Sequence, residues 1–372
     1  MKTSVQVSSS VERTARVLQV EGIFDIPPSK RSEQQWNVDL PIELKPWNVG
    51  LIVGPSGCGK STVARELFPE SMKATYEWSG SQSILDGFPA SMGVKEIVDL
   101  MSSVGFSSPP SWLRPFHTLS NGEQFRVTMA RTLAESKDLA VVDEFTSVVD
   151  RTVARIGSCA MAKTVRRREQ KFIAVTCHED VEEWLQPDWV YRPAEQTFAW
   201  RLLRRRPPIE LEIRRVNHSM WKIFKRHHYL SQDINPACYA FCAFLNGQPI
   251  AFDAWLPFVG KLKDSRKARR GHRTVCLPDY QGVGIGGALF GHIASAWAAL
   301  GLRAFSNTAH PAEIRNRARS PNWKMIRPPS RTNRDNNARL NATRASGRLS
   351  ASFEYVGAKM PIEQAHALMM RT

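Results

Sequence analysis

A glycine-rich loop that directly follows a short apolar run constrains this chain more than any other feature. The run at residues 50–53 leads into the loop Gly54-Pro55-Ser56-Gly57-Cys58-Gly59-Lys60-Ser61-Thr62. When a strand, such a loop and a helix follow one another, backbone N–H groups face a phosphate, the lysine reaches the β- and γ-phosphates, and the first hydroxyl binds Mg²⁺. We therefore expect an α/β fold in which residues 54–62 bind ATP and Ser61 is a metal ligand.

Two later apolar runs end near residues suited to nucleotide hydrolysis. Residues 139–142 lead into Asp143 and Glu144, and residues 172–176 are followed by His178. Asp143 would hold Mg²⁺, and Glu144 would polarise the attacking water. A second interpretation of the acidic pair remains open, because such a pair could cap the next helix instead.

The order of these motifs resembles that of an ABC-type ATPase domain. Leu119-Ser120-Asn121-Gly122-Glu123-Gln124 is similar to the family's LSGGQ signature, with Asn121 in place of the first glycine. The resemblance implies that Ser120, Asn121 and Gly122, at the N-terminus of a helix, bind the γ-phosphate of an ATP held by a second subunit. Since the chain has one set of motifs, the resemblance also implies an ATP-dependent homodimer or a partner ATPase.

The same resemblance assigns further residues of the nucleotide site. His178 corresponds to the switch histidine, residues 147–150 to the D-loop, and Gln82 to the Q-loop glutamine, which is also a Mg²⁺ ligand. The segment between the glycine-rich loop and the signature is shorter than in transporter ATPases. Phe24 and Trp36 both fit poorly as the aromatic residue that stacks on adenine.

Composition and charge bound the setting of the chain. It has 372 residues, of which 42% are hydrophobic, so we expect two or three domains. The net charge of +16 favours a polyanionic partner such as nucleic acid over a merely basic surface. The sequence contains no run of about 18 apolar residues, so no membrane span is expected. Its six cysteines include no CxxC pair, which favours free thiols and a cytoplasmic protein.

The sequence divides into four parts. Residues 1–35 are expected to be a loosely structured N-terminal lead-in with one strand at 16–20, and residues 36–200 the ATPase domain. A basic, proline-containing linker at 201–208 precedes a second domain at 209–372. In that domain, Asn246-Gly247 predicts a hairpin, residues 288–300 an apolar helix, and residues 311–348 an arginine-rich, loop-rich segment.

A second glycine-rich loop, Gln281-Gly282-Val283-Gly284-Ile285-Gly286-Gly287, lies between a strand-like run and the apolar helix. Such a loop can bind a pyrophosphate, as in a second nucleotide clamp or a Rossmann fold, but the downstream acidic residue of a Rossmann unit is missing. Gln281, Gly284 and Gly286 match the [QR]-x-x-G-x-[GA] signature of the GNAT acyltransferases. This resemblance implies an α+β GNAT-like domain in which the loop, with Gly282 and Gly287, binds an acyl-CoA.

Residues for acyl transfer are suggested by a more distant likeness. His227-His228-Tyr229-Leu230 and Ala309-His310-Pro311-Ala312 resemble segments of ABC ATPases fused to an acetyltransferase, and His228-Tyr229 is distantly similar to the phage Mom DNA-modification proteins. His228 is a candidate base and Tyr229 a candidate acid or stacking residue. Each has an ordinary alternative as a packed core residue. His310 and Asp279 are weaker candidates, and a zinc site at His227, His228, Cys238 and Cys242 has no recognised spacing.

These observations lead to one hypothesis and two alternatives. The hypothesis is an ATP-hydrolysing ABC-type ATPase coupled to an acyl-CoA-dependent transferase that modifies a nucleic acid base, with DNA favoured over RNA. Residues 315–319, followed by Trp323 and Lys324, would contact phosphates and an exposed base, or else form a solvated loop. The alternatives are an ABC transporter ATP-binding subunit and a nucleic-acid-binding ATPase whose GNAT-like domain is not catalytic.

Overall fold

The computed structural model describes residues 1–10, 12–27, 31–72, 76–201, 208–228, 233–258, 267–331 and 349–370. The chain forms two compact units. The first contains residues 1–77, 135–149 and 161–206, and the second contains residues 78–134, 150–160 and 207–372. The division differs from the expected boundary at 201–208, since residues of the signature region belong to the same unit as the second half. Most of the expected linker, residues 202–207, lies outside the described residues.

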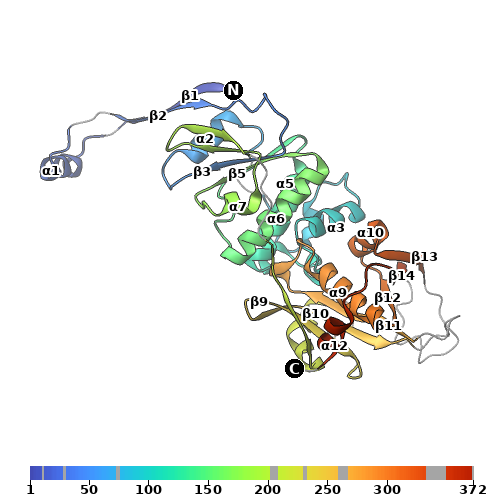
Figure 1. Ribbon diagram of the computed structural model, residues 1–372. Helices are drawn as coiled ribbons and strands as arrows, with labels where there is room; N and C mark the ends of the chain where they lie inside the picture. Colours follow the sequence, from blue (N-terminus) through green and yellow to red (C-terminus); the bar gives the residue numbers. More distant parts are fainter. Residues whose placement is uncertain are drawn as a thin grey trace. The chain divides into compact units, whose positions relative to one another are not determined.

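The first unit is built on a five-stranded sheet with the strand order β4-β5-β3-β6-β7. Its strands are β3 (Val49–Val53), β4 (Leu139–Val142), β5 (Lys171–Thr176), β6 (Trp189–Arg192) and β7 (Thr197–Trp200). Strands β3 to β6 are parallel, and β7 pairs with β6 in the antiparallel sense. Figure 1 labels the neighbouring strands β3 and β5 of this sheet. Because β3, β4 and β5 run the same way, the segments that follow them leave from one edge of the sheet.

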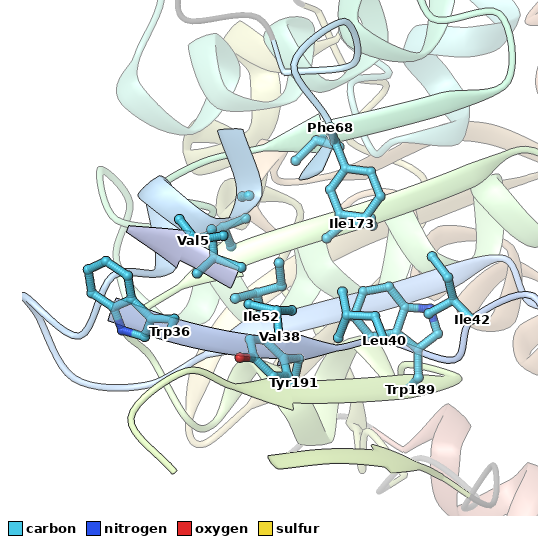
Figure 2. Close-up of a cluster of buried hydrophobic side chains, with 14 of the residues drawn as sticks. Val5, Trp36, Val38, Leu40, Ile42, Ile52, Phe68, Ile173, Trp189 and Tyr191 are labelled. Atoms are coloured by element: carbon cyan, nitrogen blue, oxygen red, sulfur yellow. The ribbon is translucent and has the colours of Figure 1, made fainter. Parts of the chain in front are cut away.

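A buried hydrophobic cluster joins this sheet to the antiparallel pair β1 (Lys2–Ser10) and β2 (Arg31–Asp39). Figure 2 shows Trp36 and Val38 of β2 in the same cluster as Ile52, Trp189 and Tyr191 of the sheet. Helices α2 (Lys60–Leu67), α7 (Val181–Leu185) and the C-terminal part of α6 (Arg151–Arg168) complete the unit. The packing is close enough to require glycine: a Cβ on Gly50 would lie 2.1 Å from the Trp189 ring.

The N-terminal prediction was wrong at residues 16–20, which form a helix and not a strand. Helix α1 spans Ala15–Phe24, and the Thr14 side chain caps it by accepting a hydrogen bond from the Val17 N–H. The apolar residues of this segment suggested a strand, whereas the capping threonine was the better signal. None of the side chains of α1 is buried.

The second unit begins with helical segments that carry the signature region. They are η1 (Ile84–Gly87), α3 (Val94–Ser103), α4 (Pro109–Trp112), η2 (Phe116–Thr118), α5 (Asn121–Glu135) and the first part of α6. Phe125 of α5 packs on α6 so closely that a Cβ on Gly157 would lie 2.7 Å from its ring. The start of α5 is therefore fixed by packing from within this unit.

The rest of the second unit is a seven-stranded sheet with the order β13-β14-β12-β11-β10-β9-β8 (Figure 1). Its strands are β8 (Glu212–Val216), β9 (Tyr239–Leu245), β10 (Gln248–Pro257), β11 (Ala268–Cys276), β12 (Arg303–Thr308), β13 (Trp323–Arg331) and β14 (Leu349–Tyr355). The β9–β10 hairpin is confirmed, and both of its turn residues, Asn246 and Gly247, have positive φ, at 50° and 77°.

The two faces of this sheet carry different helices. Helix α9 (Ile285–Ala299) packs with Ala251 and Trp255 of β10, while α8 (Trp221–Phe224) packs with Phe252 and Ala254 of the same strand. Alternation along β10 therefore places α8 and α9 on opposite faces. Helix α12 (Ile362–Met369) packs beside α9, on the same face.

The expectation of a loop-rich segment at residues 311–348 was wrong for its first part. Residues 311–319 form helix α10 (Pro311–Arg319), and β13 follows as an edge strand. Proline at the first position of the helix and the paired register of β13 with β14 explain why this arginine-rich stretch is ordered. Arg334, Arg339, Arg344 and Arg348 lie outside the described residues. Among the described residues, none of the helices has the length and apolar content that a membrane span requires.

Candidate functional site

The glycine-rich loop leaves the edge of the first sheet between β3 and α2. Gly57 and Gly59 have φ values of 82° and 88°, a left-handed conformation that favours glycine, and Gly59 is the residue before the first turn of α2. Two further segments leave the same edge: Asp143 and Glu144 follow β4, and His178 follows β5. The sheet therefore brings together three segments that are more than thirty residues apart in the sequence.

Lys60, Ser61 and Asp143 form the polar centre of this edge. The Lys60 ammonium donates a hydrogen bond to the Pro55 carbonyl at 2.7 Å, and the Ser61 hydroxyl donates one to Asp143 Oδ1 at 3.0 Å. Serine and aspartate oxygens are ligands that Mg²⁺ prefers. The two side chains are already in contact, so they fit a shared Mg²⁺ bound with ATP.

The adjacent Glu144 is exposed and has a left-handed backbone, with φ of 49°. Its N–H donates to Asp143 Oδ1 at 2.9 Å, which ties the two acidic residues together. The pair does not cap the next helix. Helix α6 is capped by Asp150, whose carboxylate accepts hydrogen bonds from the N–H groups of Thr152 and Val153.

The Trp36 ring packs against the first glycine-rich loop at Gly59. A Cβ on Gly59 would lie 2.3 Å from the Trp36 ring, and Trp36 is only 8% exposed. This contact was not predicted, because the two residues lie in separate segments. It explains why Trp36 fits poorly as an adenine-stacking residue: its ring is covered by the loop. Phe24, the other aromatic considered, is exposed on α1.

His178 is half-buried directly after β5, and its N–H donates to the Thr176 hydroxyl at 3.2 Å. Gln82 lies in the second unit, where it is exposed and its N–H donates to the Ser79 hydroxyl. The roles of both residues stay predictions. The signature residues also lie in the second unit, so the first unit holds the loop, the acidic pair and the histidine without the signature.

The signature segment begins α5 with a reciprocal cap. The Glu123 carboxylate accepts hydrogen bonds from the Ser120 N–H and hydroxyl, both at 3.0 Å, and the Ser120 hydroxyl accepts one from the Glu123 N–H at 3.4 Å. Ser111 also donates to Glu123 at 2.7 Å. Ser120 and Asn121 remain exposed, whereas Gly122 is buried. The helix N-terminus is thus fixed in place while its first residues face solvent.

The second glycine-rich loop has two halves with different surroundings. The Gln281 side chain accepts a hydrogen bond from the Ser107 N–H at 2.7 Å and donates one to the Cys276 carbonyl at 2.8 Å. A Cβ on Gly282 would lie 2.6 Å from the Gly105 Cα. By contrast, open space surrounds the Cβ positions of Gly284 and Gly287, and Gly284 precedes the 15-residue helix α9. The second half therefore fits a phosphate at the helix N-terminus, and Gly286 lies in the same turn.

Strands β11 and β12, which precede and follow α9 in the sequence, are paired at one end and separate toward the end of β11 that leads into this loop. Described residues of β11 and β12 pair only over 268–270 and 303–305. Beyond that point β11 stays paired with β10, and β12 with β14. Just past the last pair, the buried Ser306 hydroxyl accepts a hydrogen bond from Arg317 at 2.5 Å, and the Arg317 guanidinium lies 4.4 Å from the centre of the Phe290 ring.

The candidate base His228 is buried against Trp221 of α8, with ring centres 5.4 Å apart. Trp221 belongs to the cluster on the face of the sheet opposite α9. His228 therefore lies on the other face from the helix that follows the glycine-rich loop. Tyr229 lies outside the described residues. No group of three or more metal-binding side chains occurs among the residues that were described, which include His227, Cys238 and Cys242.

Three ionisable residues with shifted pKa values were not predicted, of which Arg126 and Asp253 are buried and His272 is partly buried. Burial lowers the pKa of Arg126, against the opposing effect of the Asp279 carboxylate. Burial raises the pKa of Asp253 to about 7, although Thr274 and Trp255 donate hydrogen bonds to its carboxylate. Burial and the charges of Arg273 and Arg270 lower the pKa of His272 to about 4. A charged residue inside an apolar run, as at Arg126 and Asp253, was the signal available in the sequence.

Comparison with known proteins gave matches of structure alone. No protein-family model and no curated protein matches the sequence. An ABC transporter of the metal-chelate type is similar with a TM-score of 0.36 and 18% identity over 45% of this chain and 75% of that chain. A dimeric bacterial ABC transporter cassette has a TM-score of 0.35 and 16% identity over 42% and 86%. A bacterial Atm1-family ABC exporter with ATP bound has a TM-score of 0.34 and 17% identity over 52% and 38%.

Proposed function

We propose that the chain is an ATP-binding and hydrolysing ABC-type ATPase that closes as a dimer and serves an acyl-CoA-dependent transferase in its second half. The observation that carries the ATPase is the direct contact of Ser61 with Asp143, beside Lys60 and Glu144, at one edge of a parallel sheet. An α/β fold with glycine turns at this edge suits a triphosphate.

Each residue of the edge has a defined task in this proposal. Lys60 exchanges the Pro55 carbonyl for the β- and γ-phosphates, while Ser61 and Asp143 hold Mg²⁺, which neutralises phosphate charge. Glu144, exposed beside Asp143, orients and polarises the attacking water, and His178 assists at the γ-phosphate. The exposed N-terminus of α5 from a second copy, with Ser120 and Asn121, completes the site. ATP then closes the dimer and hydrolysis opens it.

The Glu144→Gln variant tests the ATPase proposal. It keeps the shape of the side chain and removes the base, so hydrolysis is expected to fall by roughly 10²–10⁴-fold. ATP binding would persist and the ATP-bound dimer would accumulate. Light scattering coupled to gel filtration, with and without ATP and Mg²⁺, measures the mass. A mass that stays that of one chain would contradict the proposed ATP-bound dimer. Glu179→Gln, which removes another exposed carboxylate from the first unit, is the control.

The transferase proposal rests on the open half of the second glycine-rich loop and on the separation of β11 from β12. An acyl-CoA would place its pyrophosphate on the N-terminus of α9. In the transfer, an amine nitrogen attacks the thioester carbonyl, the C–S bond breaks, the amine loses a proton, and the thiolate leaves and is protonated. The proposed acceptor is a nucleic acid base, DNA before RNA, because Arg319, Lys324 and Arg331 are exposed along α10 and β13 of a strongly basic chain.

One observation favours a second candidate function, a nucleic-acid-binding ATPase whose GNAT-like half binds without catalysis. His228, the proposed base, is 7% exposed and packs on Trp221. Labelled acetyl-CoA incubated with the protein, ATP and DNA or RNA distinguishes the two functions. Label in the nucleic acid supports transfer, whereas acetyl-CoA binding without label transfer supports the second candidate. Label in protein or a small amine would contradict a nucleic acid acceptor.

A further inference from the structure

The signature segment and the second glycine-rich loop meet at Asp279. We propose that the Asp279 carboxylate, anchored by Arg126, competes with a nucleotide phosphate at the signature half-site, and that a phosphate bound there displaces this carboxylate and shifts the start of the loop at 281–287. The inference rests on the proposed function, in which ATP is bound between two copies of the chain (the ATP sandwich), because it requires that the γ-phosphate of one copy's ATP contact α5 of the other. It adds a residue from the C-terminal half of the chain to that site.

The contacts around Asp279 place its carboxylate over the first turn of α5. A Cβ on Gly122 would lie 3.2 Å from Asp279 Oδ1. The Arg126 guanidinium, one turn further along α5, donates to the Asp279 carbonyl at 2.9 Å and lies 3.7 Å from Oδ1. Arg126 is 1% exposed and the Asp279 side chain is 51% exposed. One end of the pair is therefore buried, and the other faces the place where the signature would meet a phosphate.

Electrostatics make this carboxylate a competitor of the phosphate. The N-terminus of a 15-residue helix and the Arg126 guanidinium both favour a negative charge nearby. In the structure the Asp279 carboxylate occupies that neighbourhood. A γ-phosphate at Ser120–Gly122 would add charge of the same sign a few ångströms away, which is unfavourable unless the carboxylate moves. Occupation of the signature therefore acts on Asp279 directly.

Movement of Asp279 would affect the second glycine-rich loop, because close contacts hold the residues that follow Asp279. Asp279 is two residues before Gln281, whose side chain bridges the Ser107 N–H and the Cys276 carbonyl. The next residue, Gly282, touches Gly105, and a Cβ on Gly105 would lie 2.7 Å from the Gln281 carbonyl oxygen. A residue that moves at 279 must therefore alter the contact at Gly105 or the turn at Gly284 that begins α9.

The Asp279→Asn variant in a Glu144→Gln background tests the inference. It removes the charge and keeps the main-chain carbonyl that Arg126 binds. The ATP concentration at half-maximal dimer formation is expected to fall about five- to tenfold. Asp279→Glu should restore the original value, and Glu363→Gln, an exposed carboxylate on α12 of the same unit, should leave it unchanged. Equal midpoints for Asp279→Asn and Glu363→Gln would overturn the inference while leaving the sandwich intact.

Hydrogen exchange of the loop provides a second readout, which a merely structural role of Asp279 would not change. In the Glu144→Gln protein, ATP should alter the exchange rates of amides 282–288 by about fivefold or more, and Asp279→Asn should abolish that response, while amides 363–369 of α12 stay constant. A loop that ignores ATP although the dimer forms overturns the coupling. Absence of the ATP-dependent dimer in Glu144→Gln itself would overturn the proposed function, and the coupling with it.

Discussion

The two glycine-rich loops have similar sequences but differ in what surrounds them. The loop at 54–59 packs against Trp36. Lys60 and Ser61 follow it, so an ammonium group and a hydroxyl group lie beside its backbone. The loop at 281–287 has no charged side chain, and its first half is occupied by Ser107 and Gly105. A glycine turn before a helix thus predicts an anion site only where neighbouring segments leave it open.

Lys60 is the clearest difference between the two loops, because the second loop has no charged side chain. Charge-assisted hydrogen bonds to phosphate contribute about 1.5–3 kcal/mol each, so Lys60→Ala should weaken ATP binding about 100-fold. Titration with a fluorescent ATP analogue measures the affinity. Lys95→Ala, which removes an exposed lysine from α3, is the control and should bind as the unaltered protein does. Retained affinity in Lys60→Ala would show that the first loop holds phosphate by its backbone alone, as proposed for the second.

A second test concerns the packed half of the loop at 281–287. Gly282 has φ of 94°, and a Cβ there would overlap the Gly105 Cα. Left-handed backbone costs a non-glycine residue about 1–2 kcal/mol, and overpacking costs about 1–3 more. Gly282→Ala should therefore lower the free energy of unfolding by roughly 2–5 kcal/mol in urea titrations.

Gly301 provides the matched control for that variant. It has φ of 77° with open space around its Cβ position, so Gly301→Ala carries the backbone strain without the overlap. A loss of only about 1–2 kcal/mol is expected there. Equal losses for the two variants would mean that the contact with Gly105 does not constrain the loop.

The open half of the same loop should respond in the opposite way. Gly287 lies in the first turn of α9 with open space around it, so Gly287→Ala should raise the free energy of unfolding by about 0.5–1 kcal/mol. If that space receives a pyrophosphate, the methyl group should weaken acetyl-CoA binding about tenfold by calorimetry. Gly291→Ala, further along α9 and equally unobstructed, should keep acetyl-CoA affinity. Undiminished binding in Gly287→Ala would remove this turn from the acyl-CoA site.

The features that could be predicted from the sequence are those determined by residues close together in the chain. The loop at 54–62, the Asn246-Gly247 hairpin and the α/β sheets follow from residue pattern and turn chemistry. Trp36 under Gly59 and Gln281 on Ser107 depend on segments far apart in the sequence, and no single-sequence pattern reports such contacts. The helix at 15–24 was missed because its apolar residues are also good strand formers, and its cap was overlooked.

The burial of His228 shows the same limit for the proposed transferase. The sequence suggested a base because an imidazole titrates near neutrality, but that property depends on exposure and partners. In the structure, packing on Trp221 places His228 in the core of the opposite face. A residue type thus identifies a possible chemistry, and the fold decides whether the group can carry it out.

A last test concerns two ionisable groups on the neighbouring strands β10 and β11, Asp253 and His272, whose pH dependences oppose each other. The pKa of Asp253 is raised from its ordinary value of 3.8 to about 7, so the folded state binds more protons and stability falls as pH rises between those values. The pKa of His272 is lowered from 6.5 to about 4, so the unfolded state binds more protons and stability rises with pH over that interval. Between about pH 4 and 6.5 the two slopes, each at most about 1.4 kcal/mol per pH unit, largely cancel.

Single substitutions should expose each slope separately. Relative to the unaltered protein, His272→Gln should show a free energy of unfolding that falls more steeply from pH 4.5 to 6.5, because Asp253 then acts unopposed. Asp253→Asn should show the reverse, a steeper rise over the same interval, whatever the substitution costs in absolute stability. Urea titrations at four pH values measure both slopes. Parallel pH profiles for the two variants would mean that burial does not hold these groups in the protonation states that the structure implies.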